Sequence, residues 1–225
     1  MTIYLILIII PMLLGVFAQI RVKSAFSKYS NIRASSNLTG AEAAQQILHA
    51  AGIRDVEVRE IDSMLGDHYD PIQKRLCLSS EVYHSPSIAA LGIAAHETGH
   101  AIQHARAYAP LKARMAVVPL VQFSSQILPF VIFGGILFNA IGLLKIGVIC
   151  YLVITLFSLI TLPVEFDASR RAKIILSEMG MILPGAEARG VSSVLGAAAL
   201  TYVAAFVAAL GNLLYLLLLT QRRND

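Results

Sequence analysis

"AVVPLVQFSSQILPFVIFGGILFNAIGLLKIGVICYLVITLFSLITLPV", residues 116–164, is an apolar stretch of 49 residues that a single lysine interrupts. A helix needs about 20 apolar residues to cross the hydrocarbon core of a bilayer, so the stretch is too long for one span and suits two. A turn within 139–145 would therefore make a helical hairpin. Pro119 and Pro129 are expected to kink its first arm, and Pro163 is expected to break its second arm.

Two further segments have the length and composition of membrane spans. Residues 2–20 are apolar, lack a preceding basic region and a small-residue cleavage site, and are followed directly by Arg21, which favours a retained anchor over a cleaved signal peptide. Residues 191–219 are rich in alanine and glycine, as is typical of closely packed spans. The chain is 14% charged, against about 25% in soluble domains, and is predicted to be a multi-pass membrane protein with about four transmembrane helices.

The distribution of basic residues predicts the orientation of these spans. Four spans place both termini on one side of the membrane and residues 21–115 and 165–190 on the other. Of the 18 lysines and arginines, 15 lie in these two segments. By the positive-inside rule the two segments are cytosolic and both termini lie outside.

Residues 21–115 carry the signals of a small domain that mixes helices and strands. Thr39 and Glu42 have capping-box spacing before an amphipathic run. The expected elements are a helix over 39–52, strands over 54–61 and 74–80, a turn over 67–71, and a helix from Ser85 or Ser87 to about Tyr108. The predicted fold class is α+β, mostly α, with a small cytosolic zincin-like domain, and residues 165–190 form a second cytosolic segment.

The last of these helices contains "AAHETGHAIQH", residues 94–104. His96 and His100 are four residues apart and so share one face of a helix. Together with Glu97 they form the H-E-x-x-H pattern, in which two histidines bind Zn²⁺ and the glutamate acts as general base. A catalytic zinc takes a third protein ligand and keeps one position open for water.

Three residues are candidates for the third zinc ligand. "LPVEFDASRRA" (162–172) places Glu165 and Asp167 where the third span is expected to leave the membrane, on the side of the histidines. These carboxylates diverge on a helix, so one is expected to bind the ion and the other can orient a histidine. His104 lies about 12 Å along a straight helix from His96. It is expected to face the substrate groove or to hydrogen-bond a ligand.

These residues, together with several further motifs, resemble a known family. The H-E-x-x-H helix, the transmembrane hairpin and a glutamate in "EFDAS" resemble the gluzincin metallopeptidases of the HtpX and Ste24 kind. "DHYDP…LCLSSEVYH…AALGIAAHETGHAIQH", "LPVEFDASRRA" and "AAALTYVAA" resemble more closely the YugP-type membrane zinc metallopeptidases of bacteria, over nearly the whole chain. The resemblance implies zinc ligands at His96, His100 and Glu165, with Glu97 as catalytic base. HtpX-type proteases usually have an aspartate four residues after the third ligand, where this chain has Ser169, so Asp167 takes over that role or is itself the ligand.

Residues around the strand over 74–80 are candidates for contacts with a substrate. The strand itself is either an ordinary core strand or one that pairs with an extended peptide. His68 and Tyr83 flank it, and either side chain is expected to donate a hydrogen bond to the oxyanion of the tetrahedral intermediate.

These features predict a membrane-anchored zinc endopeptidase of a bacterial cell membrane, whose protein or peptide substrates are membrane or misfolded proteins. The alternative is a catalytically silent, zinc-stabilised scaffold or adaptor, although a structural site needs no base such as Glu97. A transporter would carry ionisable residues along its spans, which are lacking here. No basic patch interleaved with aromatic residues predicts nucleic-acid binding. The sequence does not decide between membrane protein partners and association of the chain with itself.

Overall fold

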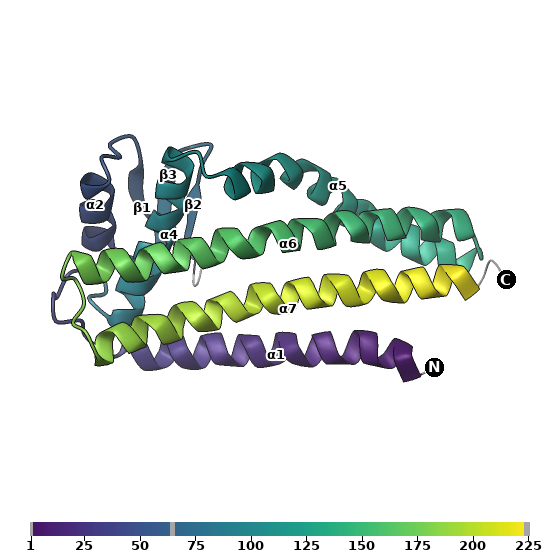
Figure 1. Ribbon diagram of the computed structural model, residues 1–225, viewed down its shortest axis with the longest axis horizontal. Coiled ribbons are helices and arrows are strands. Elements are labelled where there is room, and N and C mark those ends of the chain that lie inside the picture. Colours follow the sequence, from purple (N-terminus) through teal and green to yellow (C-terminus); the bar gives the residue numbers. More distant parts are fainter. Residues whose placement is uncertain (1, 64–65, 223–225) are drawn as a thin grey trace. The chain divides into compact units, whose positions relative to one another are not determined.

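The computed structural model describes residues 2–63 and 66–222, which are largely helical (Figure 1). In chain order the elements are α1 (Thr2–Ser30), α2 (Gly40–Ala50), β1 (Glu57–Ile61), β2 (His68–Asp70), β3 (Arg75–Ser79), α3 (Ser80–Tyr83), α4 (Ile88–Ala105), α5 (Ala109–Leu137), α6 (Ile141–Glu178) and α7 (Ala186–Arg222). Within these described residues, four helices are long and apolar enough to cross a membrane, over Ile6–Ser30, Ala109–Leu137, Ile141–Glu178 and Ala186–Arg222. The predicted α+β, mostly helical, multi-pass class is confirmed.

The chain divides into two compact units. The apolar unit comprises Met1–Gln19, Lys112–Pro163 and Leu200–Asp225. The sheet-bearing unit comprises Ile20–Leu111 and Val164–Ala199. Each of the four long helices contributes residues to both units, and the strands and the short helices belong to the second.

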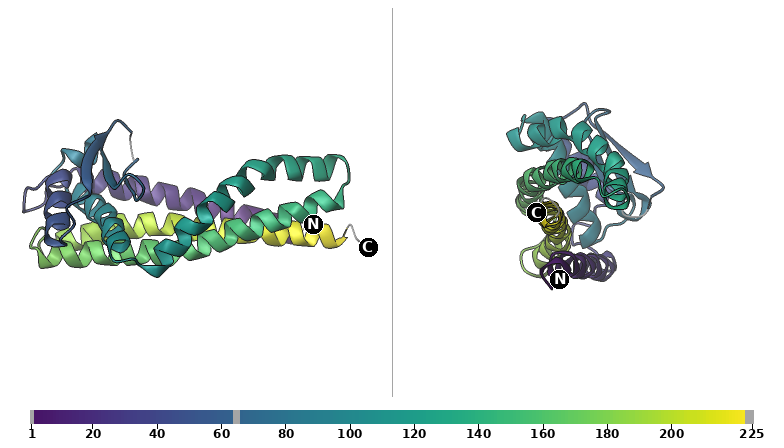
Figure 2. Two further views of the ribbon diagram at one scale, coloured as in Figure 1. Left: turned by 90° about the horizontal axis from the view of Figure 1, so that it is seen from above. Right: turned by 90° about the vertical axis from the view of Figure 1, so that its right-hand side faces the viewer.

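The apolar unit contains the predicted helical hairpin. Helix α5 ends at Leu137, Asn139 takes a positive φ of 51°, and α6 begins at Ile141, so the turn is tight. Figure 2 shows that α5 bends along its length, and Pro119 lies inside it. Pro163 also lies inside a continuous helix, so the expected break in α6 is wrong. A proline removes one backbone hydrogen bond, and neighbouring groups in a packed helix can compensate for that loss.

The sheet of the second unit has the order β1–β3–β2. Strand β3 is parallel to β1 and antiparallel to β2, and both predicted strands are confirmed. The turn expected over 67–71 is wrong, because His68–Asp70 forms β2. The turn follows this strand, where Asp70 Oδ1 accepts the N–H groups of Ile72 and Gln73. A short strand beside a turn-forming aspartate shows too little alternation to be recognised in sequence.

Strand β3 is the central strand, and this position decides its role. Its residues Arg75–Ser79 pair with β1, and Arg75–Cys77 also pair with β2. At its end, Asp67 Oδ1 accepts the N–H of Ser79 at 2.8 Å. From Arg75 to Cys77 both edges of β3 are paired, so this part of the strand has no free ladder for an extended peptide and is an ordinary core strand.

The two helices that position the site begin where their caps predict. Thr39 and Glu42 form the complete capping box before α2. The Ser87 hydroxyl accepts the N–H of Ala90 at 3.1 Å and caps α4, which ends at Ala105. The short helix α3 was not predicted, since one turn leaves no periodic pattern.

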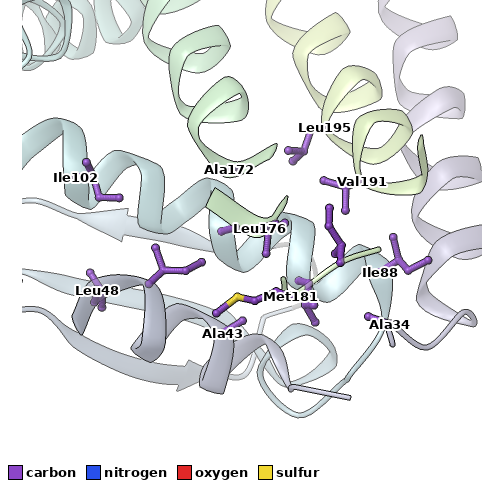
Figure 3. Close-up of a cluster of buried hydrophobic side chains, with 14 of the residues drawn as sticks. Ala34, Ala43, Leu48, Ile88, Ile102, Ala172, Leu176, Met181, Val191 and Leu195 are labelled. Atoms are coloured by element: carbon purple, nitrogen blue, oxygen red, sulfur yellow. The ribbon is translucent and has the colours of Figure 1, made fainter. Parts of the chain in front are cut away.

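Helix α4 lies in the middle of the hydrophobic core of the sheet-bearing unit (Figure 3). Most of the core side chains come from four helices, and they include Ile47 and Leu48 of α2, Ile88, Leu91 and Ile102 of α4, Leu176 of α6, and Val191 and Leu195 of α7. Gly99 allows α4 and α6 to approach closely, because a Cβ there would lie 3.0 Å from the carbonyl oxygen of Ala168. The segment that carries the histidines is therefore held against α6.

Gly40 provides a test of this packing. A Cβ at Gly40 would lie 2.3 Å from the carbonyl oxygen of Val82, a backbone atom that cannot rotate away. We expect Gly40→Ala to lower the free energy of unfolding by about 1–3 kcal/mol, as overpacked cores do. Thermal unfolding of the detergent-solubilised chain measures this. Gly196→Ala is the control, because among the described residues its added Cβ would meet no atom within 4 Å beyond its own stretch of helix backbone. Equal stability of the two variants would contradict the prediction.

Candidate metal centre

The two histidines of the H-E-x-x-H pattern lie side by side on α4. The ring centroids of His96 and His100 are 4.8 Å apart, and the rings are inclined at 83°. This arrangement follows from the helix, in which residues four apart stand one turn above the other. The two imidazoles therefore point to the same side of α4.

Glu165 of α6 completes a group of three potential metal ligands. Its Oε2 atom lies 3.3 Å from His96 Nε2 and 3.5 Å from His100 Nε2. One ligand atom from each residue lies within 4.8 Å of the other two. The Glu165 side chain is 2% exposed, so its carboxylate is enclosed together with the imidazoles.

The donor atoms of this group fit a zinc ion. Zinc binds histidine nitrogen and carboxylate oxygen at about 2.0–2.2 Å with tetrahedral angles, which separates two ligand atoms by about 3.3–3.6 Å. The distances from Glu165 Oε2 to the two Nε2 atoms match this separation. Two imidazoles and one carboxylate are also one of the donor sets found in catalytic zinc sites, in which the fourth position stays open.

The outer nitrogen of each imidazole is held by a neutral side chain. His100 Nδ1 lies 3.0 Å from Gln103 Oε1, and His96 Nδ1 lies 3.1 Å from the hydroxyl of Ser169. An amide oxygen only accepts hydrogen bonds, so His100 donates from Nδ1 and its Nε2 carries the lone pair in the neutral ring. Such contacts fix the tautomer and orientation of a metal-binding histidine.

Gln103 connects His100 to a further set of charged groups. Its side chain is fully buried, and its Nε2 donates to the carbonyl oxygen of Val164 at 2.8 Å and to Asp167 Oδ2 at 2.9 Å. Asp167 in turn accepts from Arg170 Nη2 at 2.6 Å and from Arg171 Nε at 2.5 Å. Sequence reasoning missed Gln103, although a polar residue one turn after His100 in an apolar helix was a usable signal.

The candidate base Glu97 has an environment that favours proton uptake. Burial raises the pKa of the Glu97 carboxyl, and the nearby charges of Glu165 and Asp67 act in the same direction, against the opposite effect of His96 and His100. A general base is most effective when its pKa approaches the working pH, so a raised carboxyl pKa suits this role.

Burial by itself would lower the pKa of His100. The hydrogen bond to Glu165 and the charges of Glu97 and Glu165 outweigh this effect, so the pKa of His100 lies above its ordinary value. In the absence of a cation, the two glutamates therefore favour the protonated imidazole.

The remaining predicted residues lie outside the group of three. His104 Nδ1 shares a hydrogen bond of 2.9 Å with the Tyr69 hydroxyl, and His68 Nδ1 is bonded to the carbonyl oxygen of Gly66. Tyr83 contacts the ring of His84 edge-on. Asp167 is hydrogen-bonded to Gln103 and both arginines, as described above. The oxyanion role of His68 or Tyr83 stays a prediction.

Comparisons with known proteins assign the chain to a family. The chain belongs to the family described as "Putative neutral zinc metallopeptidase", whose sequence profile matches residues 4–221. It is 44% identical over 212 residues to the "Putative membrane protease YugP" of Bacillus subtilis (strain 168), covering 94% of each chain. No solved structure matches it. The family implies zinc, and a proteolytic role is supported.

The contact between Gln103 and His100 can be tested by zinc binding. Gln103→Leu removes the acceptor of the His100 Nδ1 proton and leaves Asp167 without its buried donor. We expect zinc affinity to fall about 10–100-fold, as for other outer contacts of zinc ligands. Competition with a chromophoric chelator measures it.

Thr98→Val is the matched control for this substitution. Thr98 is also fully buried on α4, but its hydroxyl donates to the carbonyl oxygen of Ala94 within the helix. Zinc affinity should stay at the wild-type value in this variant. A Gln103→Leu variant that binds zinc as tightly as Thr98→Val would show that His100 needs no outer partner.

Proposed function

We propose that this protein is a membrane-anchored zinc endopeptidase in which His96, His100 and Glu165 hold the ion and Glu97 is the catalytic base. The observation that carries the proposal is the placement of Glu165 Oε2 at 3.3 and 3.5 Å from the two Nε2 atoms. Glu165 is proposed over Asp167 because the oxygens of Asp167 already accept hydrogen bonds from Gln103, Arg170 and Arg171.

The roles of the residues follow from their places in the centre. Zinc, when bound, supplies a Lewis acid that activates water near neutral pH and polarises a scissile carbonyl. Glu97, next to His96 in the chain, accepts the proton of the attacking water and returns it to the leaving amine. Gln103 and Ser169 keep the two imidazoles turned with Nε2 toward Glu165.

A catalytic role explains Glu97 better than a structural one. A carboxyl group in an apolar environment is unfavourable unless it is paired or functional. A structural zinc site closes all four positions with protein ligands, whereas the described residues offer a group of three. The scaffold alternative leaves the carboxyl of Glu97 without a use.

The proposed setting is a bacterial cell membrane with the metal centre on the cytosolic side. Residues 21–115 and 165–190 carry 15 of the 18 lysines and arginines and would face the cytosol, with both termini outside. Residues 2–20, 116–164 and 191–219 would cross the bilayer. Substrates reaching such a centre would be membrane proteins or misfolded proteins near the membrane surface.

Glu97→Gln separates catalysis from metal binding. The amide keeps the size of the side chain but cannot accept the proton, so hydrolysis should fall at least about 100-fold. Zinc content should stay at one ion per chain. The measurements are cleavage of a fluorogenic peptide library and elemental analysis, both on the purified zinc-loaded chain.

His96→Ala and Glu165→Ala complete this experiment, since each removes one proposed ligand and should lose the ion. If Glu165→Ala retains one zinc per chain, the third ligand is Asp167 or His104. If the wild type and Glu97→Gln are equally inactive while both hold zinc, the chain is the scaffold and not the peptidase.

Zinc affinity should also depend on pH. The ion requires neutral imidazole, and the pKa of His100 is raised, so protons compete from above the ordinary histidine pKa of about 6.5 downward. Affinity should be constant in alkaline solution and, for each histidine ligand that takes up a proton, fall by up to about tenfold per pH unit at lower pH. In Glu97→Gln one cause of the raised pKa is gone, so the fall should begin at a lower pH. The measurement is zinc affinity of the wild type and of Glu97→Gln from pH 8.5 to 5.5. Equal pH profiles of the two proteins would contradict the assignment of His100 as a zinc ligand close to Glu97.

A further inference from the structure

The two oxygens of the Asp167 carboxylate on α6 have different partners. Oδ2 accepts from Gln103 Nε2 at 2.9 Å and from Arg171 Nε at 2.5 Å. Oδ1 accepts from Arg170 Nη2 at 2.6 Å. Of the two arginines, Arg171 therefore holds the oxygen that also receives the buried amide.

The orientation of the Gln103 amide decides which of its atoms faces His100. The amide nitrogen donates to the carbonyl oxygen of Val164 and to Asp167 Oδ2, which leaves the amide oxygen to face His100 Nδ1 at 3.0 Å. A reversed amide would place its oxygen against these two acceptors and its nitrogen against the imidazole. The neutral ring would then carry its proton on Nε2, the atom that lies beside Glu165. The two acceptors therefore keep Nε2 free for a metal ion.

The two arginines differ in how firmly they are held. The Arg170 side chain is 66% exposed, whereas that of Arg171 is 22% exposed. The guanidinium carbon of Arg171 lies 5.9 Å from the ring centroid of Tyr108, a distance at which a cation and an aromatic face attract each other. Arg171 is therefore the more enclosed of the two donors, and a second side chain supports it.

Tyr108 connects this arrangement back to the helix that carries the histidines. It follows the end of α4, and its N–H donates to the main-chain carbonyl oxygen of Gln103 at 2.9 Å. Gln103, Asp167, Arg171 and Tyr108 thus form a closed ring of contacts between the end of α4 and α6. The amide beside the metal centre is held by its own backbone carbonyl on one side and by its side chain on the other.

We propose that Arg171 is a positioning residue that fixes the imidazole of His100 through two intervening side chains. Its guanidinium keeps the carboxylate oxygen of Asp167 on the Gln103 amide. Without this donor the carboxylate would turn toward solvent, because a carboxylate in a protein interior is unfavourable unless donors surround it. The amide would then lose one of its two acceptors. The inference rests on the proposed role of His100 as a zinc ligand.

Arg171→Met tests this role, because methionine keeps an unbranched side chain but removes the donor. We expect zinc affinity to fall about tenfold, the lower end of the range for outer contacts of zinc ligands. Competition with a chromophoric chelator measures it on the full chain in detergent. Arg170→Met is the matched control, since it removes an equal charge from the same carboxylate but at Oδ1. Its zinc affinity should stay within about threefold of the wild type, as expected for an exposed ion pair.

Two milder variants keep the test decisive if Arg171→Met does not fold. Arg171→Lys retains a cationic donor four residues after Asp167 on α6, so it should bind zinc more tightly than Arg171→Met. Tyr108→Leu leaves every charge in place but removes the aromatic support, and it should lower zinc affinity about two- to fivefold. Equal zinc affinities of Tyr108→Leu and the wild type would then decide against the proposal.

The imidazole proton of His100 separates positioning from a general loss of stability. In the zinc-loaded chain with isotope-labelled histidine, the Nδ1–H resonance of His100 is the one that disappears in Gln103→Leu. It should be sharp in the wild type and in Arg170→Met, and broadened by exchange with water in Arg171→Met. An unchanged resonance in Arg171→Met, or equal zinc affinities of the two methionine variants, would overturn the proposal. A wild type that binds no zinc would instead contradict the proposed function, and this inference with it.

Discussion

The contact between the Glu165 carboxylate and the two imidazoles of α4 is the constraint around which the sheet-bearing unit is arranged. A carboxylate that is 2% exposed is strongly unfavourable in a protein interior unless cations or hydrogen-bond donors surround it. Here the donors come from a helix 60 to 70 residues earlier in the chain. The positions of α4 and α6 along each other, called their register here, must therefore be held closely. Only then can the two imidazoles and the carboxylate share a proton or a metal ion.

The packing of α4 on α6 provides this register. Gly99 stands between the two histidines in the chain, and its missing side chain allows the backbone of α6 to approach at Ala168. Gln103, one turn further along, donates to the carbonyl oxygen of Val164 next to Glu165. One residue thus removes bulk and another adds a hydrogen bond, and both act on the segment of α6 that carries the carboxylate. Close packing transmits such placement because interiors have little free volume.

The outer contacts of the histidines differ from the common arrangement, in which a carboxylate accepts the imidazole proton directly. Both partners here are neutral, a serine hydroxyl and an amide oxygen. The carboxylate of Asp167 is connected to His100 through Gln103, and two arginines compensate its charge. The negative charge that acts directly on His100 is therefore that of Glu165 and Glu97.

The amino-acid sequence by itself determined the elements that local physics controls. Apolar runs of sufficient length predicted the four membrane-spanning candidates, and the caps at Thr39 and at Ser85 or Ser87 predicted about where α2 and α4 begin. Helical periodicity placed His96 and His100 on one face, because that relation needs no other segment. The strand β2 and the unbroken course of α6 escaped sequence analysis, since a neighbouring strand and packed helices override the signals of a turn and a proline.

Only the tertiary structure decided which distant residues meet these histidines. Sequence left Glu165, Asp167 and His104 open as partners, and the choice depends on how α6 is rotated against α4. A helix turns about 100° per residue, so residues two apart point to nearly opposite sides. Glu165 therefore reaches the imidazoles while Asp167 turns to Gln103 and the arginines. That rotation is fixed by packing over the whole contact, which no local pattern of residues encodes.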